Sequence, residues 1–250
     1  MNPTRKIALI TGVAFIVTFV ASIPAAFYFY SPVLDHADYI LGAGADTRIG
    51  WGAVLEVILV VANVATAVVL FPVVKRQNES VALGYVAART FESAMIAVGI
   101  IAVLAVVTMR QELAGAAASS ASSAGLGQSL VAIHDWTFLL GPGILPGIGN
   151  GLLLGYLMYR SELVPKGMAA LGMIAGTLLI ASAIPILLGV YEAGSAPQVV
   201  ATAPEFIWEA FLGIYLTFKG FRPAGLRKLG FDTGEPVPAS SPKTELRTAA

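Results

Sequence analysis

The sequence predicts an all-α fold, a polytopic bundle of six transmembrane helices with both chain ends in the cytoplasm. Three observations predict it: an apolar composition, six long apolar stretches, and an uneven distribution of Lys and Arg between the connecting loops. Of the 250 residues, 57% are hydrophobic and only 12% are charged, whereas a soluble domain carries about 25% charged residues. So little charge cannot cover a water-facing surface of this size, and the mean hydropathy of +0.80 agrees with a lipid-facing one.

Six apolar stretches are candidates for the membrane spans. A transmembrane helix needs about 20 mostly apolar residues to cross roughly 30 Å of hydrocarbon. The stretches cover residues 7–30, 50–74, 83–109, 130–159, 167–191 and 204–218, the last being the shortest. The first follows Arg5 and Lys6 as a signal peptide would, but its apolar run is too long for one, and we interpret it as a retained helix. We expect a transmembrane domain over residues 1–230 and a disordered, Pro/Ser-rich cytoplasmic tail over residues 231–250.

Lys and Arg collect on one side of this arrangement. That side holds Arg5, Lys6, Lys75, Arg76, Arg160, Lys166, Lys219, Arg222, Arg227 and Lys228. The opposite loops hold only Arg48 and Arg110. Because cytoplasmic loops carry the excess of Lys and Arg, the first side is expected to face the cytoplasm. The expected location is the bacterial cytoplasmic membrane, with the lipid bilayer as the main partner. The zero net charge gives no indication of a nucleic-acid partner.

Several polar side chains fall inside the predicted spans, where a charge costs about 2.5–3.5 kcal/mol. Helical spacing puts Glu56 and Asn63 on one face and Tyr85, Arg89 and Glu92 on one stripe. Depth, at about 1.5 Å per residue, brings Glu56, Glu92, Glu209 and His134 into one layer, with Arg89 about one turn below. The candidate polar layer consists of Glu56, Asn63, Arg89, Glu92, His134 and Glu209. Asp135 and Glu205 are further polar residues of the same spans.

The layer has two interpretations, because three carboxylates face one guanidinium. Arg89 with Glu92, or with a carboxylate of another helix, could be a structural ion pair that fixes the helix register. Alternatively, the excess negative charge could hold protons, a cation or a small solute. A zinc enzyme would need more nitrogen ligands than His134 supplies, and the metal question stays open. An enzyme acting on lipid is the third class, and the absence of a nucleophile motif or a three-ligand metal set favours transport over it. No cofactor is expected.

The fourth predicted span carries glycines four residues apart and two prolines. The glycines, expected to form one face for close helix packing, are Gly143, Gly147, Gly151 and Gly155. Pro142 and Pro146 remove backbone donors, so a kink or a broken helix is expected between them. Broken helices in transporters place freed backbone groups at a substrate site. Asn150 follows the expected break and could bind those groups or a solute.

Short motifs follow one another along the whole chain except the tail. They are Arg48-x-Gly50 running to Glu56, Phe71-Pro72, Arg89-x-x-Glu92, His134-Asp135, Gly155-Tyr156-Leu157-x-x-Arg160-Ser161 with Val164-Pro165, and Glu209 ahead of Lys219-Gly220. In this order they resemble the bacterial family catalogued as domain of unknown function 4386. The resemblance implies a bacterial multi-pass membrane protein of about this length. It does not imply any particular activity.

Overall fold

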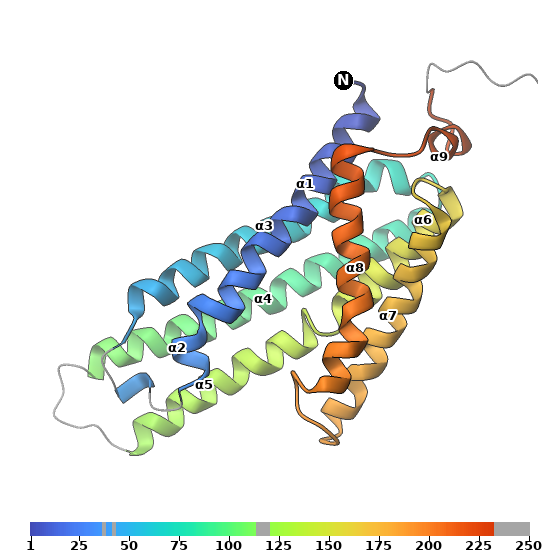
Figure 1. Ribbon diagram of the computed structural model, residues 1–250. Coiled ribbons are helices and arrows are strands. Elements are labelled where there is room, and N and C mark those ends of the chain that lie inside the picture. The colour runs from blue at the N-terminus through green and yellow to red at the C-terminus, as the bar shows by residue number, and fades with distance from the viewer. Residues whose placement is uncertain (37–38, 42–43, 114–120, 233–250) are drawn as a thin grey trace, which may run out of the picture.

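A computed structural model describes residues 1–36, 39–41, 44–113 and 121–232, and every regular element in these ranges is a helix (Figure 1). The long helices are α1 (Pro3–Pro24), α3 (Asp46–Val74), α4 (Glu79–Leu113), α5 (Ala121–Leu140), α7 (Lys166–Leu187) and α8 (Ala196–Phe218). The short ones are η1 (Ala25–Phe29), α2 (Ser31–Leu34), η2 (Tyr39–Leu41), η3 (Gly147–Leu154), α6 (Gly155–Ser161) and α9 (Pro223–Lys228). The predicted all-α bundle is confirmed. The predicted tail lies, from residue 233 on, outside the described residues.

The long helices pack side by side in one elongated bundle (Figure 1). α1 packs against both α3 and α8, α4 packs against α3 and α5, and η3 packs between α4 and α7. The N-terminus, α6 and α9 lie at one end of the bundle, and α2 and the start of α5 lie at the other (Figure 1). Residues far apart in the sequence therefore meet in the interior, where η3 approaches α4, α7 and α8.

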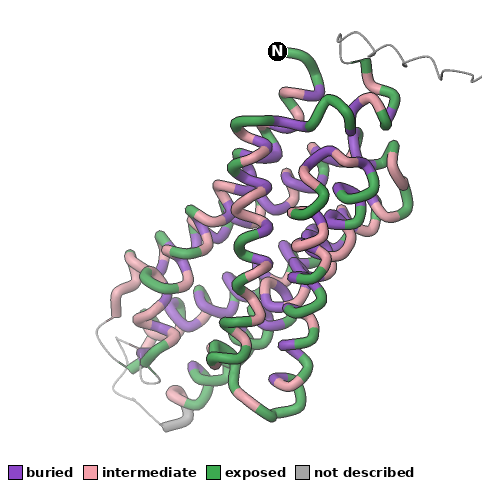
Figure 2. The backbone as a smooth tube through the Cα atoms, turned by 45° about the vertical axis from the view of Figure 1, so that its right-hand side comes forward, coloured by how far each residue is buried: buried purple, intermediate pink, exposed green. Residues whose placement is uncertain are grey.

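Among the described residues, five helices are long and apolar enough to cross a membrane: α1 with its extension η1, then α3, α4, α7 and α8. Buried residues line their inward sides and exposed residues line their outward sides (Figure 2). The exposed residues include large apolar side chains such as Val61, Ile101 and Phe218. Such a surface suits hydrocarbon better than water, and it characterises a multi-pass membrane protein. The count of six spans and the orientation with both ends inside stay predictions.

The fourth predicted span is broken rather than continuous. α5 ends at Leu140, a turn covers residues 141–144, and the chain resumes as η3, a helix with the wider π geometry. Pro142 and Pro146 cannot donate backbone hydrogen bonds, so the α-helical ladder cannot pass through them. The amide of Gly143 instead donates to Phe138 O, 2.9 Å away and five residues back. The expected break is thus confirmed.

The glycines after the break form a close contact with α7. A Cβ atom on Gly147 would lie 2.8 Å from Gly176 O, and one on Gly155 would lie 3.2 Å from Ala169 O. Gly151 faces the backbone of Gly176 directly. Gly143 does not belong to this face, contrary to prediction, because it lies in the turn and its nearest neighbour is Leu139. The spacing of four residues has no meaning across a break in the helix.

Candidate functional site

Arg89 is the centre of a polar cluster buried between α3 and α4. Its side chain is 2% exposed. Its Nη1 atom donates a hydrogen bond to Glu92 Oε2, 2.6 Å away, and its Nη2 atom donates to Asn63 Oδ1. Asn63 Nδ2 in turn donates to Glu92 Oε1, 3.1 Å away. These three side chains form a closed ring of contacts, and the ion pair expected between Arg89 and Glu92 is present.

η3 passes close to this ring because Gly149 faces α4. A Cβ atom on Gly149 would lie 3.3 Å from Ala88 Cβ and 3.6 Å from Arg89 Cδ. The absence of a side chain there lets the η3 backbone lie against the stem of Arg89. On the same stripe of α4, the hydroxyl of Tyr85 donates to Thr66 Oγ1, 3.4 Å away. The stripe predicted from the spacing of Tyr85, Arg89 and Glu92 therefore faces the interior.

Two carboxylates of α8 complete the cluster. Glu209 accepts a hydrogen bond from Asn150 Nδ2, 2.5 Å away, and lies within electrostatic range of Arg89. Glu205 lies one turn earlier on α8 and is 2% exposed. Neither of its carboxylate oxygens has a hydrogen-bond partner within the described part of the chain. Three carboxylates, those of Glu92, Glu205 and Glu209, thus face the single guanidinium.

Trp208 fixes η3 against α8. Its indole Nε1 donates to Asn150 O, 2.9 Å away. Its ring fills the space that Gly172 of α7 leaves open, where a Cβ atom would lie 2.6 Å from Trp208 Cε2. Because the backbone of Asn150 is held by Trp208, its side chain is directed at Glu209. Trp208 and Glu209 of α8 thus both bind Asn150 of η3.

Glu56 and His134 form a second, separate polar group. The hydroxyl of Tyr30 lies within electrostatic range of the Glu56 carboxylate, and neither Tyr30 Oη nor Glu56 Oε2 makes a regular hydrogen bond within the described part of the chain. The His134 ring meets the Tyr30 ring edge-on at 5.9 Å. A cavity of about 10 Å³ opens between Glu56, His134 and Thr137, and this volume has room for about one water molecule.

The predicted single layer is therefore divided in two. Asn63, Arg89, Glu92 and Glu209 come together, whereas Glu56 and His134 lie apart from them. Seven residues of helix separate Glu56 from Asn63, about 10 Å at the usual rise, so the two residues share a face but not a level. Within the described residues, no three His, Asp or Glu side chains are grouped to hold a metal ion.

Two residues of these polar groups were not predicted as part of the candidate layer, namely Glu205 and Tyr30. Glu205 stands four residues before Glu209 and shares its helix face, which is the signal that could have included it. Tyr30 has no comparable signal, because a tyrosine at the end of a span is ordinary in membrane helices. Its approach to Glu56 depends on how η1 and α3 pack against each other.

Comparison with known families gives one match. The family model described as Domain of unknown function (DUF4386) matches residues 10–220, a segment that contains both polar groups. Comparison with curated proteins and with solved structures gives no match.

Proposed function

Because the chain belongs to the family described as Domain of unknown function (DUF4386), we propose its function from the geometry: it carries protons through the membrane, and Glu205 with Glu209 holds the transported proton. One observation carries the proposal. Glu205 is buried and its carboxylate has no hydrogen-bond partner in the described chain. A carboxylate without a partner is the costliest group to keep charged in a low-dielectric interior. A proton is the simplest ligand that removes the cost.

The balance of charge supports this role. Arg89 is directly paired with Glu92 and also bonded to Asn63, so only a residual attraction reaches α8. Glu205 and Glu209 repel each other across one helical turn. Two neighbouring carboxylates in a low-dielectric site cannot both ionise, and such pairs share a proton. The pair therefore has the composition of a site that binds and releases one proton.

The broken helix supports transport over a purely structural role. π-helical turns occur frequently at functional sites, and interrupted spans carry the binding sites of many transporters. Here Asn150, in the π-helical segment after the interruption, donates a hydrogen bond to Glu209. Further polar groups lie nearer the start of α3 than Asn63 does. They are Glu56 and His134, which line a small cavity. We propose them as a second proton-binding position, about 10 Å along α3 from Asn63.

One part of the cluster supports a second function, a purely structural ion-pair network. Arg89, Glu92 and Asn63 form three hydrogen bonds with one another, as expected for an ion-pair network that only fixes the register of α3 and α4, although Arg89 Nε has no hydrogen-bond partner among the described residues. That explanation accounts for three of the residues and leaves Glu205 without a role. We further propose that the protein works in the cytoplasmic membrane of a bacterium, which the family resemblance and the distribution of Lys and Arg support.

Proton flux into liposomes tests the proposal. The purified full chain is reconstituted in vesicles that contain a pH-sensitive dye, and a potassium diffusion potential drives protons inward. We expect acidification well above that of protein-free vesicles, and a loss of at least about 100-fold in the Glu205→Gln variant, since one positioned acid–base group contributes about that much or more.

Glu192→Gln is the matched control, because Glu192 is an exposed carboxylate in the connection between α7 and α8. It should conduct like the parent. The proposal fails if the parent acidifies vesicles no faster than lipid alone, or if Glu205→Gln, folded and inserted, conducts as well as the parent.

A further inference from the structure

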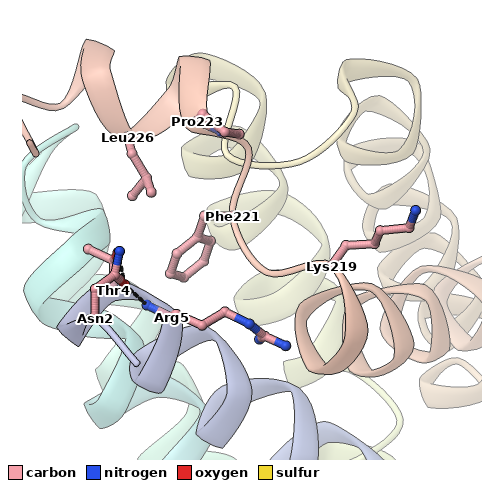
Figure 3. A pocket seen from close by; sticks show the side chains of 7 residues that line it. All are labelled: Asn2, Thr4, Arg5, Lys219, Phe221, Pro223 and Leu226. Carbon is pink, nitrogen blue, oxygen red and sulfur yellow. Dashed lines mark hydrogen bonds between the residues drawn. The ribbon is translucent and has the colours of Figure 1, made fainter. Parts of the chain in front are cut away.

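A pocket of about 150 Å³ lies at the end of the bundle that carries the N-terminus (Figure 3). It is formed by the start of α1, the turn after α8, and α9. The lining residues are Asn2, Thr4, Arg5, Lys219, Phe221, Pro223 and Leu226. Phe221 and Leu226 point toward the start of α1 (Figure 3). The pocket therefore combines an apolar wall with polar and cationic groups.

The charge of the pocket is positive. Arg5 and Lys219 line it, and no carboxylate does. Arg5 is held in place, since its Nη1 atom donates to Leu216 O at 2.9 Å and its Nη2 atom donates to Thr217 O at 2.6 Å. Lys219 is exposed, and its ammonium group has no ion pair or hydrogen bond with any described residue. Lys219 extends away from Arg5 at the edge of the pocket (Figure 3), so the two cations together give this end a positive charge, which favours an anion and phosphate in particular.

The level of the pocket along the bundle identifies the source of the anion. α1 begins at Pro3 and α8 ends at Phe218, and both are long and apolar enough to span a membrane. The pocket therefore lies where the hydrocarbon gives way to the headgroup layer. Phosphates of the lipids themselves occupy this layer, and basic pockets between membrane helices bind anionic headgroups. Phe221 and Leu226 provide the apolar surface that a glycerol backbone and the upper acyl chain require.

We propose that this pocket binds the headgroup of an anionic phospholipid, with Arg5 beside the phosphate, Lys219 adding positive charge at the edge of the pocket, and Phe221 and Leu226 against the glycerol and acyl chain. The site would connect the N-terminus, α8 and α9 through one lipid. It is independent of the acidic cluster around Arg89, so its failure would leave the proton proposal unchanged.

Native mass spectrometry of the full chain in a neutral detergent tests the proposal with phosphatidylglycerol as the probe. We expect one phosphatidylglycerol to bind in preference to phosphatidylcholine. Lys219→Gln should weaken this binding about fivefold, since a basic residue near the headgroups contributes about 1 kcal/mol. Lys75→Gln is the control, because Lys75 is also exposed and adjoins the end of α3 without lining the pocket.

Three outcomes would overturn the proposal. In the first, phosphatidylcholine binds as tightly as phosphatidylglycerol, which removes the role of charge. In the second, Lys219→Gln and Lys75→Gln weaken binding equally, which assigns the effect to the general charge of that end. In the third, inorganic phosphate at equal concentration displaces the lipid completely, which makes the pocket a site for free phosphate.

Discussion

Arg89 and Glu92 form an ion pair within one turn of α4, with Arg89 Nη1 and Glu92 Oε2 2.6 Å apart and both side chains buried. Asn63 of α3 bonds to both of them. Each charge is therefore compensated by the other, and neither can be removed alone without leaving a buried charge behind. This relationship gives the first prediction.

Arg89→Ala should destabilise the folded protein by about 3–5 kcal/mol, the usual cost of breaking a buried pair. The double variant Arg89→Ala with Glu92→Gln should be less destabilised, because it removes one charge of each sign. Denaturation of the purified protein in mixed micelles, followed by circular dichroism, measures both. Equal or greater loss in the double variant would show that the pair is not the main contribution of Arg89.

The contact between Gly151 and Gly176 gives the second prediction. A Cβ atom on Gly151 would lie 2.8 Å from Gly176 N and 2.9 Å from Glu205 Oε2. Gly151→Leu should therefore force η3 away from α7, cost more than the ~1–3 kcal/mol of ordinary overpacking, and lower the yield of folded protein.

Gly50→Leu is the control for this prediction. Gly50 is also a helical glycine, on α3, but nothing lies within 4 Å of its Cβ position. It should give nearly the yield of the parent. Equal yields from Gly151→Leu and the parent would mean that the glycines serve flexibility and not close packing.

Topology gives the third prediction. Reporter fusions after Arg76, Arg160 and Arg222 should report the cytoplasm, since Lys and Arg collect on that side. Fusions at Asp38 and Ser120, both outside the described residues, should report the opposite side. A cytoplasmic signal at Ser120 would contradict the six-span arrangement and would require the broken fourth segment to be something other than a span.

Glu162, in the loop after α6, gives a prediction for pH. Hydrogen bonds from Lys228, with Nζ 2.9 Å from Glu162 Oε1, and from Lys166 hold the pKa of the Glu162 carboxyl below its usual value. Because the folded-state pKa is lowered, the stabilisation is complete above the unfolded pKa of about 4.3 and is lost as the pH falls through the folded pKa.

The melting temperature of the parent should therefore fall more steeply below about pH 4.3 than that of Glu162→Gln, which has no charge to lose. Thermal scans of both proteins between neutral and acidic pH measure the difference. Parallel curves for the two proteins would mean that the exposed contacts with Lys228 and Lys166 contribute nothing.

The sequence predicts helices better than it predicts their ends. Residues 50–74 and 83–109 are expected spans and lie wholly within α3 and α4. The last span, expected from residue 204, lies in a helix that already begins at Ala196. Proline is common at helix starts, but membrane helices also tolerate an internal proline. Pro204 alone therefore does not fix where the helix begins.

The polar site is predictable only along each helix. Spacing correctly places Arg89 and Glu92 on one face, since both lie on α4 and helical geometry relates them directly. The contact of Asn150 with Glu209 depends instead on which helices become neighbours and on the break at Pro142 and Pro146. Sequence periodicity contains neither fact, and for the same reason it could not separate Glu56 from the group around Arg89.

Infrared spectroscopy of the carboxyl groups tests the central claim most directly, namely that a proton is shared by Glu205 and Glu209. A protonated carboxyl has a C=O band well separated from the bands of carboxylates. At neutral pH the parent should show this band, Glu205→Gln should lose part of it, and Glu192→Gln should keep all of it. If Glu205→Gln keeps the band unchanged, Glu205 is not protonated in the parent, and the proposed proton site is wrong.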